Sequence, residues 1–207
     1  MMPGPTLKDL VAGFARGMKL ADSRRPQQIS SRTGKTYQPG LGPHTEAVTV
    51  DLVMVELAVL EPERYGKYLT GVRYPDSSSV RRCDLLVGDW AAEIKMLRIM
   101  GDNGKPNDNM LMHLLSPYQQ HRSALTDCRK LAETSLGPRK AILIFGYEYD
   151  GWPMETAVAA FEALAERAVR LGQREHTGVG GLIHPIHRRG GVFGWELLGV
   201  TEGVSTA

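Results

Sequence analysis

The sequence has little cysteine: Cys83 and Cys128 are the only two among its 207 residues. Two isolated thiols build neither a disulfide scaffold nor a zinc cluster, which excludes small domains that depend on either. Long apolar runs are missing too, because no stretch approaches the roughly 20 apolar residues that a membrane-spanning helix needs. We therefore expect no membrane partner, and we expect both cysteines to lie in a core, one on a strand and one on a helix.

A secretory signal is also missing from the N-terminal segment MMPGPTLKDLVAGFARGMKL, which has no continuous apolar stretch followed by a small-residue cleavage site. A cytoplasmic location is therefore expected. The length corresponds to one compact domain, and 25 basic against 23 acidic residues give a net charge of +2. We expect residues 1–43 to form an N-terminal helix and a basic arm, and residues 44–207 to form the compact domain itself.

Acidic residues are absent between Asp22 and Glu46, although the whole chain is nearly balanced in charge. Four basic residues lie in this interval among Ser, Gln, Gly and Pro: Arg24, Arg25, Arg32 and Lys35. A polar basic segment of this kind can follow a phosphate backbone, or it can be a solvated linker. The sequence leaves a DNA-binding arm and a linker equally open.

The spacing of apolar residues predicts the order of helices and strands. Helices are expected over 6–20, over 46–60, from a capping box at Ser116 to Gly137, and from Pro153 to Gly172. The helix over 46–60 is apolar on nearly every side and is expected to be buried. Strands are expected in 80–96, which divides around Gly88-Asp89, and over 141–147, 181–186 and 192–200, with a loop over 98–109. The predicted class is α/β, with a mixed sheet flanked by helices.

The turn at Gly88 and Asp89 determines which side chains share a face of the predicted hairpin. With these residues as the turn, Asp84 lies opposite Glu93, with Cβ atoms about 5 Å apart. Period-two alternation places Lys95 on the same face. Opposed carboxylates repel each other, and a hard divalent cation with oxygen ligands would offset the repulsion. A solvated polar strand face is the alternative.

An acid on an early helix, Glu46, is followed by Asp84 on one strand and Glu93-Ile94-Lys95 on the next, and then by a helix and a buried strand. This order resembles the PD-(D/E)xK nuclease superfamily, which includes many type II restriction endonucleases. The resemblance covers residues 46–147. It departs from the family pattern in one place, because Cys83 and not proline precedes the aspartate.

A literal Pro75-Asp76 pair lies earlier, in a Ser-rich stretch that suits a turn, so Asp76 is the alternative to Asp84. On the helix over 46–60, Asp51 and Glu56 are alternatives to Glu46. The hairpin register favours Asp84 for the motif aspartate.

The resemblance implies a restriction-endonuclease-like fold and Mg²⁺-dependent hydrolysis of DNA phosphodiester bonds. Asp84, Glu93 and the carbonyl of Ile94 would hold Mg²⁺ beside the scissile phosphate. Lys95 would orient or help to deprotonate the attacking water, and Glu46 would complete the site. Cutting both strands of double-stranded DNA further implies a homodimer with one site in each chain.

Two other functions stay open beside a type II restriction enzyme. One is a recombination or repair nuclease that selects DNA by its structure. The other is a non-catalytic nucleic-acid-binding module on the same fold. The intact set of Asp84, Glu93 and Lys95 argues against the second.

Two further polar segments are candidates for DNA contacts. The first is the start of the helix expected after Ser116, where phosphate contact and an exposed first turn are both open, and it includes Gln119 and Arg122. The second is a basic cluster at the tip of the late hairpin, where a phosphate or base contact and a solvated turn rank ahead of a metal, and it consists of His184, His187, Arg188 and Arg189.

Overall fold

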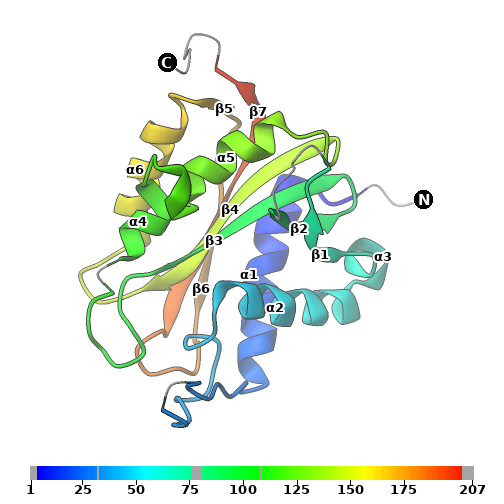
Figure 1. Ribbon diagram of the computed structural model, residues 1–207. Coiled ribbons are helices and arrows are strands. Elements are labelled where there is room, and N and C mark those ends of the chain that lie inside the picture. Colours follow the sequence, from blue (N-terminus) through cyan, green and yellow to red (C-terminus); the bar gives the residue numbers. More distant parts are fainter. Residues whose placement is uncertain (1–3, 32, 76–80, 108, 202–207) are drawn as a thin grey trace.

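The computed structural model describes residues 4–31, 33–75, 81–107 and 109–201. A seven-stranded sheet crosses the molecule in the order β1-β2-β3-β4-β7-β5, and β6 pairs with β7 beside this path (Figure 1). The strands are β1 (Leu69–Arg73), β2 (Arg82–Val87), β3 (Trp90–Arg98), β4 (Arg139–Glu148), β5 (Val169–Leu171), β6 (Glu175–Gly180) and β7 (Arg189–Val200). Only β3 and β4 run parallel among these pairs. The expected mixed sheet of an α/β protein is confirmed.

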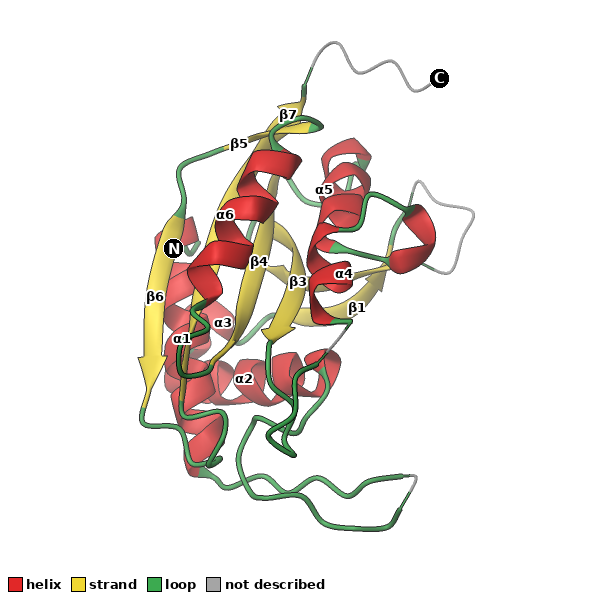
Figure 2. Ribbon diagram, turned by 90° about the vertical axis from the view of Figure 1, so that its left-hand side faces the viewer, coloured by secondary structure: helices red, strands yellow, loops and turns green. Residues whose placement is uncertain are grey.

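Helices cover both faces of this sheet (Figures 1 and 2). They are α1 (Leu7–Ser23), α2 (Glu46–Leu60), α3 (Pro62–Tyr65), α4 (Met110–Leu115), the 3-10 helix η1 (Gln119–His121), α5 (Ala124–Glu133) and α6 (Met154–Ala165). One apolar core lies between the sheet and α1 and α2, and a second lies between the sheet and α4, α5 and α6. On β4, Leu143 and Phe145 enter the first core, whereas Ile142 and Ile144 enter the second. Burial on both faces explains why the sequence of β4 is continuously apolar.

The first two helices, α1 and α2, each begin directly after a threonine whose side chain caps the helix. Thr6 accepts a hydrogen bond from the N–H of Asp9, and Thr45 caps α2 in the same way. Both predicted helices are confirmed, but the expectation that α2 is buried on all sides was wrong. Its outer side exposes four apolar residues: Val48, Val55, Val59 and Leu60. The buried apolar residues of α2 all join the core shared with α1, so that side of the helix is the covered one.

The predicted hairpin between β2 and β3 is confirmed in its turn and in the three residue pairs nearest to it. The expected pair of Asp84 with Glu93 is not among the pairs that these two strands form, because the Asp84 carboxylate binds the backbone of Ile94 instead. Gly88 has a φ of +55°, a left-handed conformation that glycine adopts at little cost. The pairs that flank the turn are Val87 with Trp90, Leu86 with Ala91 and Leu85 with Ala92. Cys83 is buried on β2 and Cys128 is buried on α5, as expected from the sequence.

The helix expected from Ser116 begins later than predicted. Ser116 ends α4, the short η1 follows, and Arg122 takes a φ of +47°, which interrupts the helical path. Ser123 then caps α5 by accepting the N–H of Thr126. Ser116 and Ser123 both have the character of a cap, and the backbone of Arg122 decides in favour of Ser123.

The C-terminal third also differs from the prediction. The helix expected to reach Gly172 ends at Ala165, and Val169–Leu171 forms β5 at the sheet edge. The late hairpin is displaced along the chain, because β6 ends at Gly180 and the residues 181–188 connect it to β7. Two glycines and a single valine in β6 gave a weak strand pattern there, and pairing with β7 stabilises it.

The segment between α1 and α2 extends away from the sheet as a long loop (Figure 2). An antiparallel bridge between Ile29 and Thr36 joins the two sides of this loop. Among the described residues, none of the helices combines the length and the apolar character needed to cross a membrane.

Candidate active site

The strand β3 continues beyond the last residue that pairs with β2. There, two side-chain carboxylates accept the backbone N–H groups of β3 that a neighbouring strand would otherwise bind. Past the last pair, which involves Ala92, Asp84 Oδ2 accepts the N–H of Ile94 at 2.8 Å. Two residues further on, Glu46 Oε2 accepts the N–H of Met96 at 2.6 Å. Alternate N–H groups of a strand point to the same side, so the two acids lie side by side where β2 would otherwise continue.

Glu93 points toward α5 and is enclosed there, with 2% of its side chain exposed. Its Oε1 accepts the hydroxyl of Tyr74 and lies 2.7 Å from Lys130 Nζ. Burial raises the pKa of Glu93 well above its ordinary value, and the charges of Asp84 and Asp127 raise it further. The ammonium of Lys130 opposes this shift without cancelling it.

Lys95 lies between α2 and α5. Its Nζ is 2.8 Å from Asp127 Oδ2 and 3.6 Å from Glu46 Oε1. Burial alone would lower the pKa of Lys95, but the surrounding carboxylates, first those of Glu46 and Asp127, raise it above its ordinary value. Asp127 also binds Lys130, with Oδ1 2.7 Å from Nζ, so one carboxylate holds both ammonium groups.

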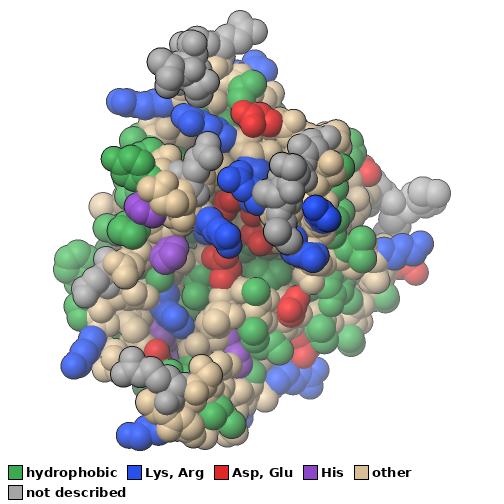
Figure 3. All heavy atoms as spheres, in the orientation of Figure 1, with side chains coloured by type: hydrophobic (Ala, Val, Ile, Leu, Met, Phe, Trp, Pro, Cys, Tyr) green, Lys and Arg blue, Asp and Glu red, His purple; other side chains and the backbone are tan. Residues whose placement is uncertain are grey.

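These residues form one group of charges, which we call the carboxylate–lysine cluster: Asp84, Glu93, Glu46, Asp127, Lys95 and Lys130. Four carboxylates against two ammonium groups leave two negative charges in excess when all are ionised. Burial raises the pKa of Glu46 as well, and the charge of Lys95 only partly offsets this effect. Figure 3 shows acidic side chains in the middle of this face with Lys and Arg side chains around them. The cluster is short of positive charge.

The structure brings together the residues singled out in the sequence for the centre of the site: Asp84, Glu93, Ile94, Lys95 and Glu46. The alternative aspartate, Asp76, lies outside the described residues. Of the other two acids of α2, Asp51 is exposed, and Glu56 accepts the guanidinium of Arg24 at 3.0 Å. Glu46 is therefore the acid of this helix that contacts β3.

Three members of the site's surroundings were missed by sequence reasoning. Asp127 and Lys130 lie one turn apart on the face of α5 that also carries Cys128 and Leu131. Charged residues on an otherwise apolar helix face were the signal that could have identified them. Tyr74 follows the edge strand β1, and no pattern in the sequence distinguishes it.

The oxygen atoms of the cluster are turned toward protein donors. Among the described residues, no three side chains of His, Cys, Asp or Glu stand close enough together to hold a metal ion in this arrangement. The carboxylates instead accept hydrogen bonds from the backbone N–H groups of Ile94 and Met96 and form ion pairs with the two lysines.

The basic residues proposed for DNA binding are spread over three segments. On the arm, Arg25 and Lys35 are exposed, Arg24 is engaged by Glu56, and Arg32 lies outside the described residues. Gln119 begins η1, and Arg122 directly follows it and is exposed.

At the end of the β6–β7 connection, Arg188 and Arg189 are both exposed. The guanidinium of Arg189 lies 3.1 Å from Asp150 and 3.8 Å from Glu148. Arg188 is therefore the freer of the two for an anionic partner.

The two histidines of that connection do not lie on an exposed tip, and this expectation was wrong. His184 and His187 are buried, with ring centroids 4.6 Å apart in a stacked arrangement. His187 Nε2 lies 2.8 Å from the carbonyl of Met100, and burial lowers the pKa of His187 to about 4. The ring of His187 also packs against that of Tyr147, with centroids 4.8 Å apart, so both histidines lie inside the protein instead of on an exposed turn.

A scan against models of protein families, a search of curated proteins and a search of solved structures each found no match to this chain.

Proposed function

We propose that this protein is a Mg²⁺-dependent DNA endonuclease of the PD-(D/E)xK type, with a restriction-endonuclease-like fold, that hydrolyses phosphodiester bonds as a type II restriction enzyme does. The supporting observation is the meeting of Asp84, Glu93 and Lys95 at the diverging ends of β2 and β3. Glu46 joins them from α2, in the order that the resemblance implies.

The donor atoms of the cluster fit Mg²⁺ in kind and in charge. Carboxylate and carbonyl oxygens are the ligands that this ion prefers, and an excess of two negative charges matches the charge of one ion. The N–H and C=O of a strand residue point to the same side, so the carbonyl of Ile94 faces the side of Asp84. Asp84, Glu93 and Ile94 would hold the ion, with Glu46 at its margin. Bound there, Mg²⁺ would supply charge neutralisation at the phosphate and polarisation of water.

Lys95 is suited to act as a fixed positive charge. Its raised pKa keeps the amine protonated at neutral pH, which favours orientation of water and stabilisation of phosphate oxygens over proton abstraction. Asp127 and Glu46 hold its ammonium from two sides and restrict its position. Positioning of this kind lowers the entropy lost on reaching the transition state.

The partners follow from the same chemistry. Arg25 and Lys35 are exposed on the arm, where they can contact the phosphates of double-stranded DNA. Cutting both strands of a symmetric site takes two active centres, so we propose a homodimer in the cytoplasm. A repair nuclease would select a DNA structure instead of a sequence, and a binding module would retain DNA affinity without cleavage.

The decisive experiment is to incubate the purified protein with unmethylated plasmid and phage DNA in Mg²⁺ and to map the ends. Wild type is expected to cut plain duplex at one fixed sequence. Glu93→Gln and Lys95→Met are expected to lose cleavage and to keep DNA binding in Ca²⁺, which occupies oxygen sites but is a poorer Lewis acid. Lys105→Met, which changes an exposed loop lysine, is the matched control. Full cleavage by Lys95→Met would contradict the assignment.

A further inference from the structure

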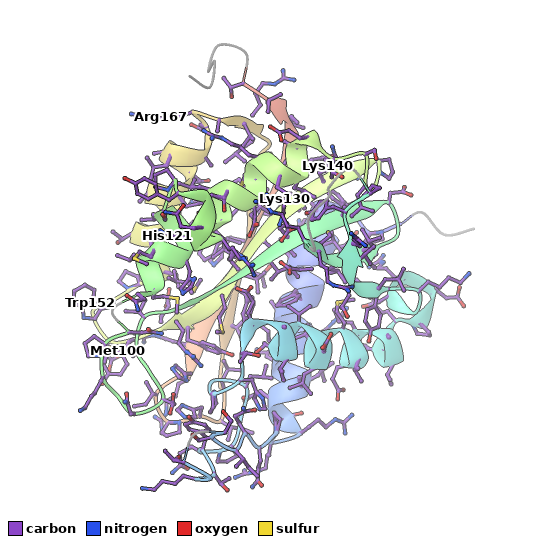
Figure 4. All side chains as sticks on the ribbon, in the orientation of Figure 1. Met100, His121, Lys130, Lys140, Trp152 and Arg167 are labelled. Atoms are coloured by element: carbon purple, nitrogen blue, oxygen red, sulfur yellow. The ribbon has the colours of Figure 1, made fainter. Side chains whose placement is uncertain are left out.

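Lys130 lies where three groups of the site converge on one ammonium. Nζ is 2.7 Å from Glu93 Oε1 and 2.7 Å from Asp127 Oδ1, and it stands 4.9 Å from the centroid of the Tyr74 ring. Figure 4 shows Lys130 on α5 above β3, in the middle of the molecule. The side chain is therefore bound by the residue that the proposed function requires as a metal ligand.

The two lysines of the cluster differ in what they bind. Lys95 is held by Asp127 and Glu46, outside the pair formed by Asp84 and Glu93. Lys130 instead takes the same Glu93 oxygen that Tyr74 reaches. A cation coordinated by Glu93 would compete with Lys130 for that oxygen and would leave the shorter contact of Lys95, to Asp127, intact.

We propose that Lys130 is an internal cation that closes the site in the metal-free protein and that Mg²⁺ must displace from Glu93. This inference rests on the proposed function, and it adds a regulation of metal binding by the protein's own side chain. A lysine is suited to the role because its ammonium is a compact point charge on a flexible four-carbon stem. One turn of α5 separates it from Asp127, which can retain the ammonium after Glu93 is released.

Metal affinity in the absence of DNA tests the proposal, with Mg²⁺ and Ca²⁺ titrated calorimetrically into the full-length protein. Lys130→Met is expected to bind either ion about tenfold more tightly than wild type, because the competing charge is gone. Arg129→Met removes one positive charge from an exposed position of the same helix and is expected to change the dissociation constant less than twofold. Equal or weaker binding by Lys130→Met would overturn the proposal while leaving the proposed function standing.

A measurement on the wild-type protein covers the case in which Lys130→Met folds poorly. Acylation of lysine amines, read by mass spectrometry, is expected to be slow at Lys130 in EDTA and at least fivefold faster in saturating Mg²⁺, because the ammonium is released from Glu93. Lys140, which donates to backbone carbonyls at the end of α5, should react at the same rate in both conditions. Bound metal without faster labelling of Lys130 would overturn the displacement. No binding of either ion by wild type or variant would overturn the proposed function together with this inference.

Discussion

Asp84 and Ile94 are joined by a hydrogen bond in which a side-chain carboxylate replaces a neighbouring strand as the acceptor, with Oδ2 2.8 Å from the backbone nitrogen. The same carboxylate raises the pKa of Glu93 through its charge. Asp84 thus stabilises the sheet by accepting a backbone hydrogen bond, and it destabilises the site because its negative charge repels that of Glu93. An amide in its place would separate the two effects, because it keeps an acceptor oxygen and loses the charge.

We expect Asp84→Asn to be more stable than wild type in EDTA by about 1 kcal/mol, because one of the opposed charges is removed. For a chain of this size, this corresponds to a rise of the thermal midpoint by roughly 3 °C. Mg²⁺ should raise the midpoint of wild type and leave that of the variant nearly unchanged, since an ion stabilises only the state that binds it. Differential scanning calorimetry with and without the metal measures both effects.

Asp89→Asn provides the control for this substitution, because Asp89 lies exposed in the hairpin turn. It should leave the midpoint and its response to Mg²⁺ as in wild type. A lower midpoint for Asp84→Asn in EDTA, with equal Mg²⁺ shifts in both proteins, would identify these acids as an ordinary polar strand face.

The raised pKa of Glu93 predicts a pH dependence of stability with a definite sign. In the folded protein Glu93 takes up a proton at a higher pH than in the unfolded chain, so its contribution to stability is present at low pH and lost as pH rises through the folded pKa. The unfolding free energy of wild type in EDTA should therefore increase relative to that of Glu93→Gln as pH falls from 8 toward 5. Urea titrations at several pH values give this difference, and a constant difference would contradict the assignment.

His187 predicts the opposite trend. Its folded pKa of about 4 lies below the ordinary value of 6.5, so its contribution is complete above 6.5 and is lost as pH falls toward 4. Between pH 7 and pH 5 wild type should lose about 2 kcal/mol that His187→Gln does not lose, since glutamine can still donate to the Met100 carbonyl. His113→Gln, at an exposed position, should follow wild type.

The arm predicts a salt dependence of DNA binding. Arg25→Ser with Lys35→Ser should weaken binding and reduce the slope of log K against log salt by about 2, because each lost phosphate contact releases about 0.9 counterion fewer. Fluorescence anisotropy in Ca²⁺ at several salt concentrations measures the slope. Lys8→Ser with Lys67→Ser removes the same charge from other exposed positions and should leave the slope unchanged. An unchanged slope in the arm variant would make the arm a linker.

The core of the site was predictable because it depends on local geometry. A two-residue turn at Gly88 and a period of two place Asp84, Glu93 and Lys95 near one another without any knowledge of the rest of the chain. The sequence did not predict that Asp84 would bind the backbone of Ile94. That contact depends on where β2 stops pairing with β3, and beyond this point Glu46 of α2 accepts the next N–H on the same side of the strand, that of Met96.

The contributions of α5 were not predictable in the same way. The position of Asp127 and Lys130 over β3 depends on where α5 begins. Because Arg122 has a left-handed backbone conformation, α5 begins after Ser123 and not after Ser116. Ser116 and Ser123 are both serines that can cap a helix, so their side chains alone do not show which of them begins α5. Tertiary contacts decide between them.

The root of the arm depends on residues from distant parts of the chain. Asp22 lies at the end of α1, and its carboxylate accepts the N–H of Leu41 through Oδ1 and the N–H of Ile183, 161 positions away, through Oδ2. During synthesis the second of these bonds cannot form until the 161 positions from Asp22 to Ile183 have been made. Full attachment of the arm is thus coupled to folding of β6 and the segment after it, and until then only the bond to Leu41 can hold its root.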